Sequence, residues 1–213
     1  MASSSPATHC GRSFTDVDEV RQGVWHWHAA HPDWKPGEDW GELVSSYAIE
    51  DDRRLLLFDP LALPGELEDR AALRETTIVL TCPWHRRDAV GIADRLNATL
   101  YVPPPDQGDA DAVSGIVFRA GDRLPVGVEA FAGFEPNDLV LWVESHRVVV
   151  AGDTLVDRGS GLELPGDWLR EGVTVEEIQE GLRPLLELPV EYVLATHGGP
   201  FDRDALEGAL AEL

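Results

Sequence analysis

The stretch LVLWVESHRVVVAGDTL, residues 139–155, decides the fold. Its two apolar runs, 139–144 and 147–153, are separated by two residues, which predicts a β-hairpin. The apolar part of the second run stops at Gly152, and the run ends with Asp153. A side chain placed where a strand ends sits on a rigid element and faces the rim of the sheet, where ligands and catalytic groups are held well.

The same arrangement occurs at two other strand ends. The run EYVLAT is followed by His197, and the run TTIVLT (76–81) is followed by Cys82, Pro83, Trp84 and His85. Histidine and aspartate are both good ligands for zinc or iron. These strand ends are therefore candidate positions for a metal site.

The rest of the chain alternates apolar runs with turn signals and contains no linker. Helices are expected where apolar residues recur at helical spacing, over 86–96, 174–185 and 202–213, and Thr174 with Glu177 forms a capping box. Further strands are expected over 22–28, 43–49, 54–60, 99–103, 115–118 and 126–131. The order of elements predicts two packed sheets with helices outside, in one domain over 20–213, after a disordered lead over 1–19.

Composition narrows the class of partner. The 213-residue chain has a net charge of −22, and Lys35 is its single lysine. Such an acidic surface repels phosphate backbones and anionic lipid, so nucleic acid and membranes are not expected partners. Cys10 and Cys82 do not make a disulfide framework and are interpreted as free thiols in a reducing cytoplasm.

Four segments resemble the metallo-β-lactamase superfamily in order and spacing: LLLFDP after the opening hairpin, TCPWHRRDA before a helix, AGDTL, and ATHGGP. The resemblance covers about residues 20–213. It implies an α/β (α+β) fold, a four-layer αββα sandwich with the active site along one edge. It also implies that Asp153 and His197 bind metal and that Asp59 contacts the metal ligands without binding the metal itself.

The chain departs from that family's pattern at two places. The family motif H-x-H-x-D-H is replaced by CPWHRRDA, which contains only His85 and Asp88. The family's G-H-T-P-G segment is replaced by AGFEPND, which puts Phe134 at a histidine position. A phenylalanine cannot bind metal, so a dinuclear centre is not expected.

The remaining residues predict a reduced, mononuclear site. His85, Asp153 and His197 would give two nitrogens and one oxygen, the ligand count of an open catalytic site. The ion would be zinc, with iron or manganese as alternatives, and metal-activated water would hydrolyse an ester, thioester, lactone or related bond of a small molecule. Asp88 is the candidate general base or fourth ligand, and the pocket candidates are Trp84, Glu135 and Trp168.

Two questions stay open from sequence alone. The missing histidines equally suit a metal-free, non-catalytic member of the fold that serves as a binding or scaffold protein. The segment VWHWHAAHP (24–32) places His26 and His28 on one strand face and His31 in a turn. Three interpretations of these histidines stay open: metal ligands, residues at the pocket mouth, or ordinary surface imidazoles. A rim rich in tryptophan would suit a homodimer contact.

Overall fold

The computed structural model describes residues 16–106, 108 and 112–211. Of the expected N-terminal lead, residues 1–15, which include Cys10, lie outside the described residues. Asp18 and Glu19 belong to the first strand, β1. No helix in the described parts of the chain is long and apolar enough to cross a membrane.

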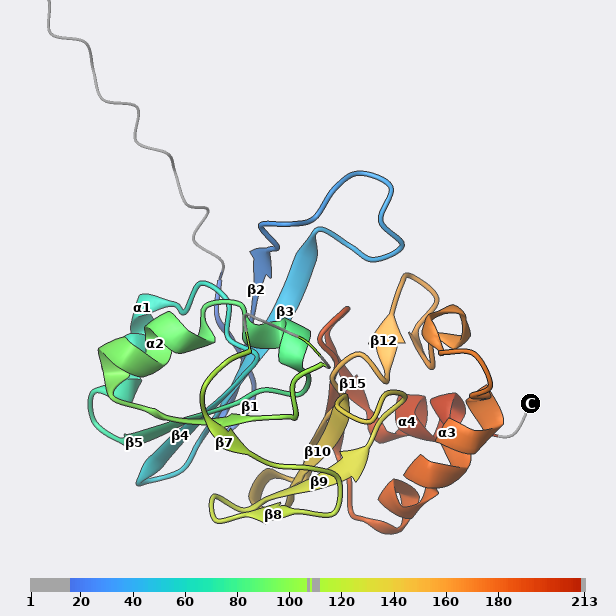
Figure 1. The fold of residues 1–213 in the computed structure, drawn as a ribbon. Helices are drawn as coiled ribbons and strands as arrows, with labels where there is room; N and C mark the ends of the chain where they lie inside the picture. The colour runs from blue at the N-terminus through green and yellow to red at the C-terminus, as the bar shows by residue number, and fades with distance from the viewer. Residues whose placement is uncertain (1–15, 107, 109–111, 212–213) are drawn as a thin grey trace, which may run out of the picture.

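Two mixed sheets form the centre of the molecule (Figure 1). The first has seven strands in the order of the chain: β1 (Asp18–Arg21), β2 (Val24–Ala30), β3 (Leu43–Glu50), β4 (Arg54–Phe58), β5 (Glu75–Val79), β6 (Thr99–Val102) and β7 (Ile116–Val117). Its neighbours are antiparallel up to β4 and parallel from β4 to β7.

The second sheet has six strands in the order β15 (Pro200–Asp202), β14 (Tyr192–Leu194), β11 (Val148–Val150), β10 (Leu139–Val143), β9 (Val128–Ala132) and β8 (Arg123–Leu124). Only the β11–β14 pair is parallel. A separate small ribbon pairs β12 (Val156–Asp157) with β13 (Leu162–Glu163).

Four helices and four short 3₁₀ turns complete the described chain. The helices are α1 (Gly65–Ala71), α2 (Ala89–Leu96), α3 (Val175–Leu182) and α4 (Arg203–Ala209). The 3₁₀ turns are η1 (Pro83–Arg86), η2 (Glu144–His146), η3 (Gly166–Trp168) and η4 (Arg183–Glu187).

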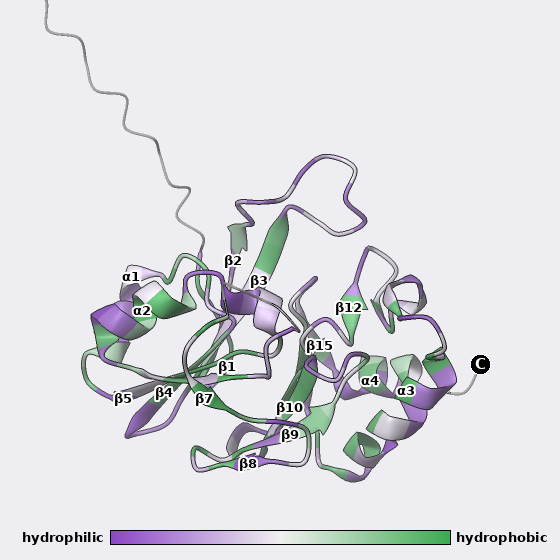
Figure 2. Cartoon of the chain, viewed as in Figure 1, coloured by the Kyte–Doolittle hydropathy of each residue, from purple (hydrophilic) through white to green (hydrophobic). Residues whose placement is uncertain are grey.

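Three apolar clusters define four layers. One lies between the two sheets and includes Phe58 and Leu141. Another packs the outer face of the first sheet, including Trp27, against α1 and α2. The third packs the outer face of the second sheet, including Trp142, against α3 and α4. The buried strands are accordingly apolar, while the helices carry polar outer faces (Figure 2). The order of the layers confirms the predicted αββα sandwich.

Local differences from the expected elements have physical reasons. Helix α2 begins at Ala89 rather than at Arg86, because Pro83–Arg86 forms η1 and Arg87 has φ +35°. The two strands of residues 139–153 are joined by η2, a longer connection than the two-residue turn expected. Helix α1 was not expected, since only Leu67 and Ala71 of its residues are buried and the segment shows no apolar periodicity.

Candidate metal centre

Asp153 follows a turn in which the position of Gly152 leaves no room for a side chain. Strand β11 ends at Val150, and Gly152 follows with φ +57°. A Cβ atom on Gly152 would lie 2.5 Å from Asp138 Oδ1, a separation that real Cβ atoms do not show. The turn brings the Asp153 side chain to the edge where the two sheets meet, and this side chain is buried.

His85 is held by a carboxylate from the neighbouring strand. Asp59 follows β4 with φ +45°, an uncommon conformation for a residue other than glycine. Its Oδ1 accepts the Thr81 backbone N–H at 2.9 Å, and its Oδ2 accepts the Thr81 hydroxyl at 2.6 Å. The same Oδ2 lies 3.1 Å from His85 Nδ1. Because Nδ1 faces this acceptor, Nε2 of His85 is directed toward Asp153, the arrangement that orients metal-binding histidines.

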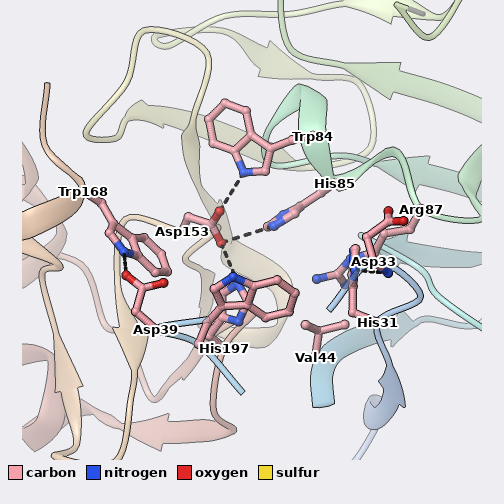
Figure 3. A pocket seen from close by; sticks show the side chains of 11 residues that line it. His31, Asp33, Asp39, Val44, Trp84, His85, Arg87, Asp153, Trp168 and His197 are labelled. Carbon is pink, nitrogen blue, oxygen red and sulfur yellow. Dashed lines mark hydrogen bonds and ion pairs between the residues drawn. The ribbon is translucent and has the colours of Figure 1, made fainter. Parts of the chain in front are cut away.

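The carboxylate of Asp153 has two different oxygens (Figure 3). Oδ2 accepts a hydrogen bond of 2.6 Å from the indole nitrogen of Trp84. Oδ1 lies 3.2 Å from His85 Nε2 and 3.4 Å from His197 Nε2. Oδ1 nevertheless has no hydrogen-bond partner, although it is buried. A buried carboxylate oxygen that has ion pairs but no hydrogen bond is unusual, and a cation bound at this place would account for it.

The charges at this site are strongly coupled. Burial alone would lower the pKa of His85, but the carboxylates of Asp153 and Asp59 outweigh it and raise this pKa from 6.5 to about 9. Burial would raise the pKa of Asp153, but the adjacent His85 and His197 hold it well below its usual range. Without a bound cation, His85 and Asp153 therefore form an imidazolium–carboxylate pair at neutral pH.

His197 faces the pair from the second sheet. It follows β14, is buried, and its Nδ1 has no hydrogen-bond partner. Trp40 and Trp168 flank its ring edge to face, with centroids 5.2 and 5.9 Å away. These indoles come from distant loops and fix the imidazole by packing rather than by hydrogen bonds.

Cys82 lies next to the candidate ligands, although its sequence pattern did not predict this position. It directly precedes η1, it is fully buried, and the ligand atoms of Cys82, His85 and Asp153 all lie within 4.8 Å of one another. Burial and the carboxylates of Asp153 and Asp138 raise the pKa of its thiol well above the usual value. The spacing C-x-x-H was the available signal, but it was interpreted as a free thiol beside a single histidine.

The site opens into a pocket of about 430 Å³ (Figure 3). Its lining comprises His31, Asp33, Asp39, Trp40, Val44, Trp84, His85, Arg87, Asp153, Trp168 and His197. On one side Trp168 donates a hydrogen bond of 2.6 Å to Asp39, which ties the loop after β13 to the loop between β2 and β3. The pocket is thus aromatic at its walls and polar at its floor.

The structure brings some of the predicted site residues together and not others. His85, Asp153 and His197 meet at Asp153 Oδ1, Asp59 stands behind His85, and Trp84 and Trp168 line the pocket. Asp88 does not line it, and its Oδ2 accepts the Ala62 N–H at 2.8 Å. Glu135 does not line it either, and its Oε2 lies 3.8 Å from Arg170 Nη1.

The three histidines of residues 24–32 have separate surroundings. His26 is buried, with Nε2 2.9 Å from the Ser45 hydroxyl. Its ring contacts that of His28, with centroids 4.5 Å apart. His31 lines the pocket beside Trp40. Only His31 therefore belongs to the pocket mouth, and His26 is not a surface imidazole.

The donor atoms of Cys82, His85 and Asp153 all lie within 4.8 Å of one another and fit one divalent cation, whereas His197 lies outside this group and approaches only Asp153 of the three. Ligands bound tetrahedrally at 2.0–2.1 Å are separated by about 3.3 Å. The distances of 3.2 and 3.4 Å from Asp153 Oδ1 to the two imidazole nitrogens match this value. Asp153 Oδ1 also accepts no hydrogen bond from the protein, so its lone pairs are available to a cation.

Comparisons with known proteins identify the fold. No protein-family model and no curated protein matches the sequence. The structure is similar to the DIM-1 metallo-β-lactamase, with a TM-score of 0.67 and 12% identity over 93% of this chain and 96% of that one. It is also similar to the FIM-1 metallo-β-lactamase from Pseudomonas aeruginosa in the mono-zinc form, with a TM-score of 0.64 and 15% identity over 92% and 93%. A metallo-β-lactamase from Erythrobacter litoralis gives a TM-score of 0.64 and 13% identity over 92% and 95%. The chain has the metallo-β-lactamase fold.

Proposed function

We propose that the protein is a metal-dependent hydrolase of a small molecule that carries an ester, thioester, lactone or related bond. One divalent ion, for which zinc is the first candidate, would be held by His85, Asp153 and His197. The observation that carries this proposal is the buried Asp153 Oδ1, which faces two imidazole nitrogens at ligand spacing and has no other partner.

The residues of the chain would divide the work as follows. When bound, a divalent ion supplies a Lewis acid for a carbonyl oxygen and a water of lowered pKa. Asp59 keeps His85 in the orientation that presents Nε2 to the site. Trp40, Trp84 and Trp168 wall the pocket, so they can hold an apolar part of the substrate and exclude bulk water.

A metal-free binding protein is the second candidate, and one observation favours it. The Trp84 indole occupies Asp153 Oδ2, and the charges of His85 and Asp153 compensate each other without an ion. Such a site could keep a binding pocket after losing its chemistry.

Metal analysis and hydrolysis assays separate the two candidates. Chelator-treated protein is offered zinc, iron or manganese, dialysed, and assayed for bound metal and for cleavage of aryl ester, thioester and lactone probes. The proposal expects one ion per chain and metal-dependent cleavage, with both lost in Asp153→Ala. The matched control is Asp88→Ala, a carboxylate outside the pocket, which should keep both. Wild-type protein that stays metal-free and inactive under all three metals overturns the proposal and favours the second candidate.

A further inference from the structure

A 3₁₀ turn places a thiol beside the proposed ligands. Cys82 has extended backbone angles (φ −147°, ψ 160°), and η1 begins at the next residue, Pro83. The His85 N–H donates to the Cys82 carbonyl at 3.2 Å. The ligand atoms of Cys82 and His85 lie within 4.8 Å of each other, so the two side chains face the same space.

The surroundings of this thiol do not resemble an apolar core. Its ligand atom lies within 4.8 Å of those of both His85 and Asp153, a group of three that stands out among the potential metal donors in the described part of the chain. A buried cysteine usually packs as a small apolar side chain. Here the neighbours of the sulfur include the Asp153 carboxylate, the His85 ring and the Thr81 hydroxyl, whose oxygen lies 3.9 Å from Sγ.

A second observation points to a ligand in this space. Asp153 Oδ1 is buried and has no hydrogen bond, since its contacts with His85 and His197 are ion pairs only, and a carboxylate oxygen of Asp153 belongs to the donor group that contains Cys82 and His85. A bound cation would compensate this oxygen and allow the thiol to bind as thiolate, because metal binding displaces the thiol proton.

We propose that Cys82 is a thiolate ligand of the metal ion, together with His85 and Asp153. The proposal rests on the proposed function, since it concerns the same ion. Cys82 is fully buried and does not line the pocket, whereas His85, Asp153 and His197 do. The sulfur therefore binds from the side away from the substrate, and the pocket side stays available for chemistry.

The sulfur ligand determines which metals the site accepts. Thiolates favour zinc and similar borderline or soft ions over manganese and magnesium, which prefer oxygen ligands. A site of two imidazoles and one carboxylate would also prefer zinc to manganese, but by a smaller factor. The protein should therefore bind zinc and cobalt far more tightly than manganese.

Cobalt(II) reports thiolate coordination directly, because it gives a thiolate-to-metal charge-transfer band in the near ultraviolet. The full chain is treated with chelator and titrated with Co²⁺, followed by competition with Zn²⁺ and Mn²⁺. The key variant is Cys10→Ser, which leaves Cys82 as the single thiol of the chain. We expect the band in wild type and in Cys10→Ser.

Cys82→Ser and Cys82→Ala are then expected to lose the band. Their zinc affinity should fall by more than the roughly 10- to 100-fold that follows loss of an outer hydrogen-bond partner. Circular dichroism shows whether these variants fold, and if they do not, the band in Cys10→Ser still decides. Cobalt bound by Cys10→Ser without the band overturns the thiolate inference and leaves the proposed metal centre standing. No cobalt or zinc bound at all overturns both.

Discussion

At the scale of single residues, Asp59 shows how backbone conformation and hydrogen bonds together orient one imidazole. Its backbone has φ +45°, and its two oxygens accept both the N–H and the hydroxyl of Thr81. Strained backbone of this kind persists only where the surroundings hold it in place, and it concentrates at functional sites. Here the result is a buried carboxylate with fixed lone pairs, 3.1 Å from His85 Nδ1.

Replacing Asp59 by asparagine should weaken metal binding without removing a ligand. Asp59→Asn keeps the shape of the side chain but loses the charge that fixes the proton on His85 Nδ1. We expect zinc affinity to fall about 10- to 100-fold, measured by competition with a chromophoric chelator. Asp88→Asn, the same change on a carboxylate outside the pocket, should leave the affinity unchanged. Equal affinities for all three proteins would contradict a role of Asp59 in positioning His85.

His26 should make stability depend on pH. Burial, followed by repulsion from His28, lowers the pKa of His26 from 6.5 to about 4. Between these values the unfolded chain binds a proton that the folded chain does not, so this contribution to stability is present above pH 6.5 and is lost as pH falls to 4. The loss amounts to about 3 kcal/mol. The variant His26→Gln does not titrate, so between pH 6.5 and pH 4 its free energy of unfolding in urea should fall by about 3 kcal/mol less than that of the wild type. If the two free energies fall equally with pH, His26 does not cause the pH dependence.

At the scale of elements, the turn after β11 sets the position of Asp153. In Gly152→Ala the new Cβ would meet Asp138 Oδ1 at 2.5 Å, in addition to the cost of φ +57°. Gly127→Ala is the matched control, because Gly127 has φ +82° and nothing within 4 Å of its Cβ position. Chemical denaturation should show about 1–2 kcal/mol lost in the control and more in Gly152→Ala. Equal losses would mean that the turn relaxes and that glycine is not required there.

The sequence predicts elements best where a local pattern agrees with tertiary packing. The capping box of Thr174 and Glu177 is present at the start of α3, and the strand ending before Asp153 is observed. Helix α1 could not be predicted, since its stability comes from two buried residues packing on the first sheet. The fold class could be predicted from the sequence, because apolar runs and turn signals recur along the whole chain.

The site was predictable only in part, because backbone turns decide which side chains meet. His85, Asp153 and His197 follow strands that end at one edge, so their meeting could be expected. The H-x-x-D spacing suggested that Asp88 would join them. Arg87, with φ +35°, interrupts the helical backbone between His85 and Asp88, and no residue pattern predicts this interruption. The C-x-x-H spacing of Cys82 and His85 likewise does not reveal that their side chains face the same space.

At the scale of the whole molecule, the charge of −22 should make stability depend on salt. Excess negative charge destabilises a compact state through self-repulsion, and salt screens it. Raising NaCl from about 0.01 to 0.15 M, where the Debye length falls from about 30 to 8 Å, should raise the thermal midpoint. A falling midpoint would mean that ion pairs such as those of Glu50 with Arg70 and Arg74 outweigh the repulsion.

A metal ion at this site would also tie the two halves of the sandwich together. His85 follows the first sheet, whereas Asp153 and His197 follow strands of the second. An ion bound only by the folded state adds about 2.7 kcal/mol when its free concentration is 100 times the dissociation constant. Calorimetry of the chelator-treated chain should therefore show a higher midpoint when zinc is added. Asp153→Asn should fold but show no such rise, and an equal rise in that variant would place the stabilising ion elsewhere in the molecule.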